Sequence, residues 1–115
     1  MKKQGLNPLT GPGNDIVSTT NLTAAGANII LFTTGRGTPL GASVPTIKVA
    51  SNSRLAKRKS NWIDFNAGEL IKSNDFENMT EEIFKLLIDI ASGRQTKNEQ
   101  NGYRDISIFK DGVIM

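Results

Sequence analysis

The sequence contains neither cysteine nor histidine among its 115 residues. The first absence excludes disulfides, thiolate metal sites, iron–sulfur clusters and cysteine nucleophiles. The second removes the commonest general base and the commonest metal ligand. Acid–base or metal chemistry would therefore depend on carboxylate, lysine, tyrosine, hydroxyl and amide groups, which suit hard cations or polyols. From the residues alone we assign no catalytic residue and no metal ligand.

Long apolar runs are also missing. No run approaches the roughly 20 residues that cross a bilayer, and the two N-terminal lysines precede no hydrophobic segment. We therefore expect no membrane span, no secretion and a cytoplasmic location. A net charge of +3 is small for a dedicated nucleic-acid binder. The length allows one small domain, expected over residues 1–115.

The apolar pattern predicts alternating strands and helices. Strands are expected over 28–33, 44–50, 62–66 and 106–109, the last followed by a turn at 111–112. The first is a continuous apolar run, which is typical of a strand buried on both faces. Helices are expected over 22–27, 54–59 and 80–91, with caps within 18–21, within 51–53 and at Thr80, and with Gly26 and Gly93 ending the first and the last.

The remaining segments are expected to be irregular. No regular element should begin before about Asp15, and the polar stretch 94–102 should be exposed. The alternation of strands and helices favours an α/β fold, a three-layer, Rossmann-like, mainly parallel sheet with flanking helices.

Three polar segments follow the first three predicted strands, at 33–38, 51–53 and 66–68. The carboxyl ends of parallel strands meet at one edge of a sheet, and ligands bind there. We therefore expect a binding site at this edge.

The first of these segments places Arg36 between Gly35 and Gly37. Neither common nucleotide fingerprint fits the spacing, and Pro39 leads toward another strand and not into a helix. A plain glycine turn without ligand is one interpretation. The other is that the guanidinium pairs with a carboxylate or phosphate. A surface salt bridge would explain Arg36 equally well.

Other polar and aromatic residues leave alternatives open. The basic run 54–59 could touch nucleic acid, but a solvated helix face is favoured because no aromatic residue is interleaved. Trp62 and Phe65 are expected in a core or an interface. Four residues could contact a metal or hydroxyl groups, or could serve as turn and cap residues: Asn14, Asp15, Asp64 and Asn66.

Six motifs occur in order along the chain, with further likeness at 91–93 and 101–103. They are Gly11-Pro12-Gly13-Asn14-Asp15, Ser18-Thr19-Thr20, Phe32-Thr33-Thr34-Gly35-Arg36-Gly37-Thr38-Pro39, Val44-Pro45-Thr46-Ile47-Lys48, Ser51-Asn52 and Ile63-Asp64-Phe65-Asn66-Ala67-Gly68. Together they resemble the C-terminal region of the altronate and galactarate dehydratase family, the altronate branch more closely. Members of that family are several times longer, which implies missing N-terminal and middle regions that carry the acid–base and metal groups.

The resemblance implies a hydro-lyase that converts D-altronate to 2-dehydro-3-deoxy-D-gluconate and water in hexuronate breakdown. It further implies a divalent metal, iron or manganese, in the full-length enzyme and none bound by this fragment, which would be inactive alone. The implied partners are the sugar-acid substrate, the remaining regions of the enzyme and a second copy in a homo-oligomer, with no nucleic acid and no membrane.

The substrate-binding residues follow from this resemblance together with their positions at the ends of strands. The carboxylate end of the substrate is assigned to Arg36 and to the amides of Gly35 and Gly37, and the hydroxyls to short polar side chains. A structural or dimerisation domain, and a galactarate-type or other sugar-acid lyase, remain as alternatives. The residues assigned to the substrate hydroxyls are Thr33, Thr34, Thr38, Asn52 and Asn66.

Overall fold

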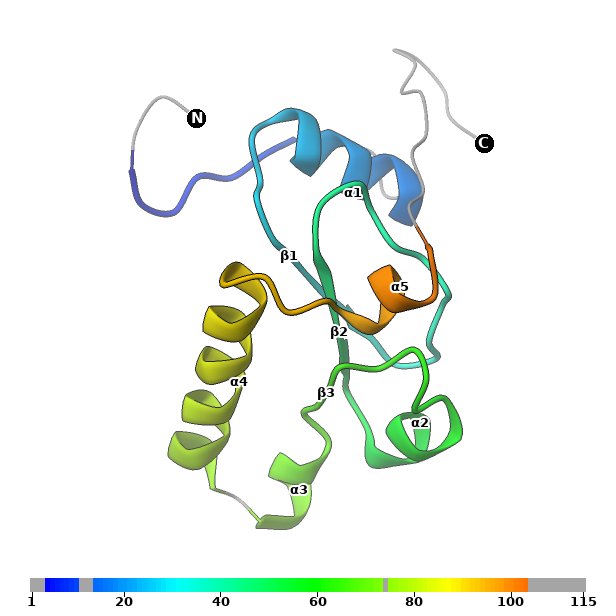
Figure 1. Cartoon of the computed structure of the whole chain (residues 1–115). Coiled ribbons are helices and arrows are strands. Elements are labelled where there is room, and N and C mark those ends of the chain that lie inside the picture. Colours follow the sequence, from blue (N-terminus) through cyan, green and yellow to red (C-terminus); the bar gives the residue numbers. More distant parts are fainter. Residues whose placement is uncertain (1–3, 11–13, 74, 104–115) are drawn as a thin grey trace.

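A computed structural model describes residues 4–10, 14–73 and 75–103 (Figure 1). Strands β1 (Ile30–Thr34), β2 (Thr46–Ala50) and β3 (Phe65–Asn66) form a parallel sheet in the order β1-β2-β3. This confirms the α/β fold and the parallel sheet. β3 is shorter than expected, because the Trp62 amide donates to the Lys59 carbonyl in a turn. The expected strand and turn over 106–112 lie outside the described residues.

The core lies on both faces of β2, all five residues of which are buried. Ile47 and Val49 pack against Ile90 of helix α4 (Phe76–Ala91). Ala50 packs with Leu55 of helix α2 (Ser53–Arg58). Because successive side chains of a strand point to opposite faces, α4 and α2 cover opposite faces of the sheet, as Figure 1 shows.

The expectation that the first strand is buried on both faces is wrong. Leu31 is 48% exposed, and the burial along β1 alternates. In the described sheet β1 pairs only with β2 and therefore forms an edge. An edge strand can leave one face to solvent, although its apolar run resembles that of a central strand.

The first helix, α1 (Asp15–Ala24), begins well before the expected 22–27. Its cap is Asn14, whose side chain accepts from the Ile16 amide. The hydroxyls of Thr19, Thr20 and Thr23 donate to carbonyls four residues earlier, so this stretch lies inside the helix and does not cap it. Gly26 follows with a φ of 106°, which confirms the predicted glycine end.

Helix α4 begins at Phe76 and not at Thr80, and it follows the short helix α3 (Glu69–Ser73). Its cap is Asp75, which accepts from the Asn78 amide, and the Thr80 hydroxyl donates inside the helix to the Phe76 carbonyl. Gly93, at a φ of 113°, ends it as predicted. None of the helices in the described residues is both long and apolar enough to span a membrane.

The polar stretch after α4 is not uniformly exposed, contrary to expectation. It contains the short helix α5 (Lys97–Gln100), which Thr96 and Glu99 close with a capping box. Thr96 and Asn98 are buried. The Asn98 side-chain amide donates to the Thr46 carbonyl of β2 at 3.1 Å. The sheet carbonyl provides the partner for Asn98 Nδ2, whereas Asn98 Oδ1 is buried with no hydrogen-bond partner among the described residues.

Candidate functional site

The ends of β1 and β2 are joined by one amide side chain. Asn52 donates from Nδ2 to the Gly35 carbonyl at 3.1 Å and accepts at Oδ1 from the Leu55 amide at 2.8 Å. The same side chain therefore caps α2 and holds the glycine loop that follows β1. The first two polar segments meet at the carboxyl edge, as predicted.

The third polar segment joins the second through Asn66. Its Nδ2 donates to the Ser53 hydroxyl at 3.2 Å and to Glu69 Oε1 at 3.3 Å, and its Oδ1 accepts from the Gly68 amide at 2.9 Å. All three predicted segments are thus brought together. Both side-chain ends of Asn66 have partners within the protein.

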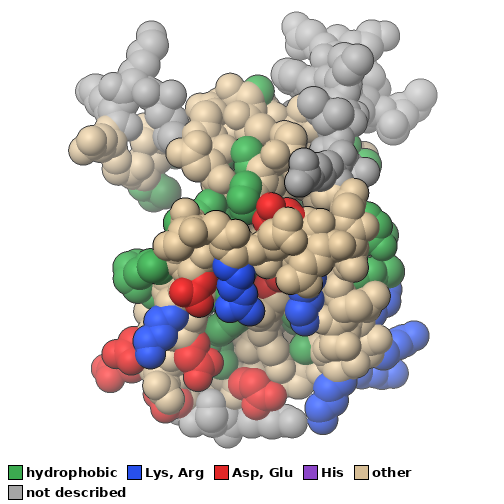
Figure 2. Space-filling model, viewed as in Figure 1, with side chains coloured by type: hydrophobic (Ala, Val, Ile, Leu, Met, Phe, Trp, Pro, Cys, Tyr) green, Lys and Arg blue, Asp and Glu red, His purple; other side chains and the backbone are tan. Residues whose placement is uncertain are grey.

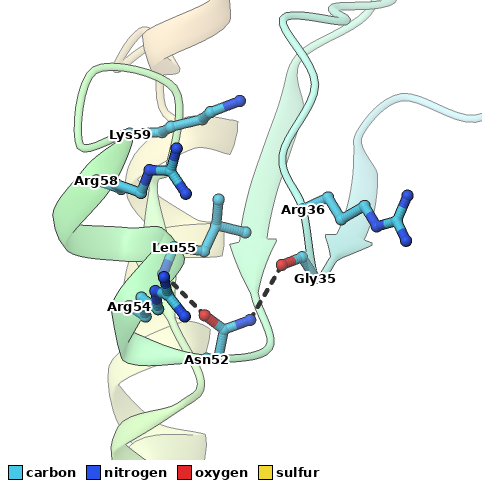
Figure 3. A pocket seen from close by; sticks show the side chains of 7 residues that line it. All are labelled: Gly35, Arg36, Asn52, Arg54, Leu55, Arg58 and Lys59. Atoms are coloured by element: carbon cyan, nitrogen blue, oxygen red, sulfur yellow. Dashed lines mark hydrogen bonds between the residues drawn. The ribbon is translucent and has the colours of Figure 1, made fainter.

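A cavity of about 560 Å³ lies between the glycine loop and α2 (Figure 3). Leu55, which is almost fully buried, supplies its apolar part. Four of the lining residues are cationic and none is acidic. The lining residues are Gly35, Arg36, Asn52, Arg54, Leu55, Arg58 and Lys59.

The positive charge of this cavity has no carboxylate partner in the described part of the chain. The one salt bridge found there joins Arg94 to Asp89, and both of its side chains are exposed. Figure 2 shows basic side chains gathered over α2 and acidic ones over α3 and the start of α4. A concave surface of one charge sign concentrates ions of the opposite sign, so the cavity is suited to anions.

Sequence reasoning missed the contribution of α2. Its basic run has the solvated face that the sequence predicts, since Arg54, Lys57 and Arg58 are exposed, but Arg54, Arg58 and Lys59 also line the cavity, with Arg58 and Lys59 extending toward the glycine loop (Figure 3). The spacing of Arg54 and Arg58, four residues apart directly after a polar segment, was the available signal. The Arg36 guanidinium extends away from α2 in the same view.

The three threonines assigned to substrate hydroxyls lie in different surroundings. Thr34 Oγ1 accepts from the Gly37 amide at 2.9 Å and so closes the loop. Thr33 is exposed and, one residue earlier on β1, points to the opposite face. Thr38 lines a separate cavity of about 340 Å³ beside Asn14 and Asp15. The structure therefore gathers Gly35, Arg36 and Asn52 around one cavity and places Thr33 and Thr38 elsewhere.

Lys48 is a second residue that sequence reasoning missed. It is fully buried in β2, its ammonium donates to the Thr38 carbonyl, and it lies 5.6 Å from the centre of the Phe32 ring. A buried lysine requires such partners. Lys48 thus holds the far end of the loop that carries Arg36.

A sequence model of the family described as D-galactarate/Altronate dehydratase, C-terminal, matches residues 1–114. The chain belongs to this family. It is 49% identical to the altronate dehydratase of Escherichia coli (strain K12) and 46% identical to that of Bacillus subtilis (strain 168), in each case over all of the chain and 23% of the relative. It is 36% identical to the galactarate dehydratase (L-threo-forming) of Escherichia coli (strain K12), over 97% of the chain and 22% of that relative. The chain spans about a quarter of these relatives.

For a domain of the galactarate/altronate dehydratase family, the implied metal needs ligands. In residues 4–10, 14–73 and 75–103 no three acidic, histidine or cysteine side chains are grouped closely enough to hold an ion. Asp64 accepts from the Lys48 amide and from the Lys97 amide, both at 2.9 Å, and Asn14 caps α1. These two residues serve the backbone, and the described residues do not fit a metal site.

Proposed function

We propose that this chain is the C-terminal domain of a sugar-acid dehydratase, that the whole enzyme removes water from D-altronate to give 2-dehydro-3-deoxy-D-gluconate, and that the domain is inactive alone. The altronate branch is favoured because identity to the altronate dehydratases, 49% and 46%, exceeds the 36% to the galactarate enzyme. We also propose a three-layer, Rossmann-like arrangement, since α4 and α2 pack on opposite faces of β2.

The observation that carries this proposal is the cationic cavity at the carboxyl edge of the sheet. It lies where open α/β sheets bind ligands, and Gly35 and Arg36 line it. In this proposal Arg36 binds the substrate carboxylate, with the Gly35 amide beside it. The Gly37 amide donates its single hydrogen to Thr34 Oγ1 at 2.9 Å, so it orients the loop and does not itself bind the substrate.

The chemistry needs such positive charge. Removing the proton next to a carboxylate creates an enediolate with a second negative charge, and fixed cations lower the energy of that species. A general acid must then protonate the departing hydroxyl. Arg36 supplies the charge stabilisation in this proposal, while the base, the acid and the iron or manganese belong to the rest of the enzyme.

Short polar side chains near the edge bind the substrate hydroxyls in this proposal. Asn52 Nδ2 makes one hydrogen bond, to the Gly35 carbonyl, and keeps a second hydrogen for a ligand. Thr34 accepts from Gly37 and keeps its own hydroxyl hydrogen as a donor. The proposal does not extend to the other three residues of this set, because Thr33 points to the opposite face of β1, Thr38 lines a separate cavity and Asn66 is hydrogen-bonded to Ser53, Glu69 and Gly68.

A second candidate role is an interface within the same enzyme or its homo-oligomer. It is favoured by large apolar side chains exposed on α4, where Phe76, Phe84 and Ile88 are 68%, 61% and 50% exposed. Under this reading, substitutions in the loop would be silent. Substitutions of Phe76, Phe84 and Ile88 would dominate the loss of activity, whereas Phe65, expected in a core or an interface, packs against the core.

The deciding experiment places Arg36→Ala in the full-length dehydratase and follows 2-keto-acid formation from D-altronate with ferrous or manganous ion. We expect kcat/KM to fall on the order of a hundredfold, with the unfolding midpoint unchanged. Arg94→Ala is the matched control, because Arg94 is exposed, pairs with the nearby Asp89 and does not line the cavity. Wild-type kinetics for Arg36→Ala would reject the assignment of Arg36.

A companion assay compares this chain alone, the remainder of the dehydratase alone and the two mixed. Turnover only in the mixture supports a domain that completes the site but has no activity of its own. Full turnover by the remainder alone would favour the interface role.

A further inference from the structure

Helix α2 and its C-cap residue present three cations to one space. Arg54 and Arg58 are four residues apart, which places them on the same face of the helix, and Lys59 follows directly. All three line the 560 Å³ cavity, and Figure 3 shows the side chains of Arg58 and Lys59 extending toward it. The cavity has the size of a small-molecule site.

These cations repel one another without any compensating carboxylate. The cavity lining contains no Asp or Glu, and the one salt bridge within the described residues involves Arg94 and Asp89. Like charges one helical turn apart destabilise a helix. The helix dipole favours Arg58 and Lys59 at the C-terminal end of α2 but disfavours Arg54 in its first turn. Helix stability therefore gives no reason for Arg54 to share this space, whereas an anionic ligand does.

The α2 cations are also distinct from Arg36. In Figure 3 the Arg36 guanidinium extends away from α2, with Leu55 and Asn52 between the two sides. Lys59 is held in place, since its ammonium lies 4.4 Å from the centre of the Trp62 ring. A β-carbon at Gly37 would come 2.9 Å from a Leu55 methyl group and 3.2 Å from Lys59 Cδ, so the glycine allows the loop to close on this wall.

We infer that Arg54, Arg58 and Lys59 form a second anion subsite, separate from the Arg36 loop, for a tetrahedral oxyanion of the phosphate or sulfate class. Guanidinium groups bind such oxygens through paired N–H donors, and the ammonium adds a point charge. Two arginines and a lysine match a divalent anion better than a single carboxylate. The subsite is the α2 wall of the cavity whose other wall, the glycine loop, carries the proposed function, and it does not require the proposed dehydration.

Trp62 provides the readout, because it is the single tryptophan of the chain and contacts Lys59. Sodium phosphate is titrated into the 115-residue chain at constant ionic strength, with sodium chloride as the comparison salt, while tryptophan fluorescence is followed. We expect a saturable change with phosphate and none with chloride. Absence of a saturable change, in the chain and in the full-length enzyme alike, overturns the subsite.

Matched variants separate this subsite from its surroundings. The double variant Arg54→Gln, Arg58→Gln should bind phosphate about tenfold more weakly, and circular dichroism should show an unchanged fold because both residues are exposed. Lys57→Gln, on the same helix but outside the cavity lining, should bind normally. An equal loss of phosphate affinity in Lys57→Gln and in the double variant would show that phosphate responds only to the overall positive charge, which would refute the subsite.

Two further arms identify the source of the oxyanion and keep the inference independent of the proposed function. Arg36→Ala should bind phosphate normally even where it abolishes turnover; loss of phosphate binding in that variant would refute a separate subsite. Glycerol 3-phosphate that binds more tightly than phosphate points to a phosphorylated organic ligand, and equal binding points to the free ion. A single-stranded oligonucleotide that binds about a hundredfold more tightly than phosphate would reassign the surface to nucleic acid.

Discussion

The backbone of Gly68 lies directly against that of Asn52. A β-carbon on Gly68 would come 2.6 Å from Asn52 Cα and 2.3 Å from the Ser53 amide nitrogen. Asn52 in turn holds the glycine loop and caps α2. The turn after β3 therefore sets the position of the residue that joins both walls of the cavity.

We expect Gly68→Ala to destabilise the domain by about 3 kcal/mol, because backbone atoms must move to admit one methyl group. Urea unfolding measures the change. Gly35→Ala is the control, since its β-carbon would meet only the Ser51 hydroxyl, at 3.3 Å. If Gly68→Ala unfolds at the same urea concentration as the wild type, the backbones of Gly68 and Asn52 do not lie as close as 2.6 Å implies.

Asp64 ties α5 to the sheet, because its two oxygens accept from the amides of Lys48 and Lys97. We expect Asp64→Ala to cost about 2 kcal/mol, as two backbone donors lose a charged acceptor. Asp89→Ala, which removes only an exposed ion pair, should cost less than about 1 kcal/mol. Equal costs measured by thermal unfolding would contradict this role of Asp64.

Lys48 steadies the loop through the Thr38 carbonyl. In Lys48→Met, which keeps an unbranched side chain, we expect hydrogen exchange at the Gly37 amide to accelerate about tenfold as the loop opens more often. The amides of α4 serve as the internal reference in the same spectrum. Uniform acceleration across the domain would instead indicate a global loss of stability.

Salt should weaken turnover if the cationic cavity attracts an anionic substrate. Raising the ionic strength from about 0.05 M to about 0.5 M shortens the range of these charges, so KM should rise while kcat changes little. The slope of log KM against log salt should be shallower in Arg58→Gln than in the wild type. If Arg58→Gln and the wild type have the same slope of log KM against log salt, Arg58 does not help to attract the substrate.

Local signals in the sequence were sufficient to predict where the first three strands lie along the chain, the two helix-ending glycines and the meeting of the three polar segments. The reason is that strand and helix periodicity, and a glycine at positive φ, depend on neighbours within a few residues. The crossover rule then brings the ends of parallel strands to one edge without knowledge of packing. The family motifs fall on these same segments.

Tertiary structure alone decided which surfaces are buried and which charges share a space. Leu31 is exposed because β1 became an edge, and Asn98 is buried because the Thr46 carbonyl, 52 residues away, accepts its hydrogen bond. Arg58 lines the same cavity as Gly35 only because Asn52 joins α2 to the glycine loop. The spacing of Arg54 and Arg58 is a local pattern, but burial and the meeting of these cations with the glycine loop depend on residues distant in the sequence.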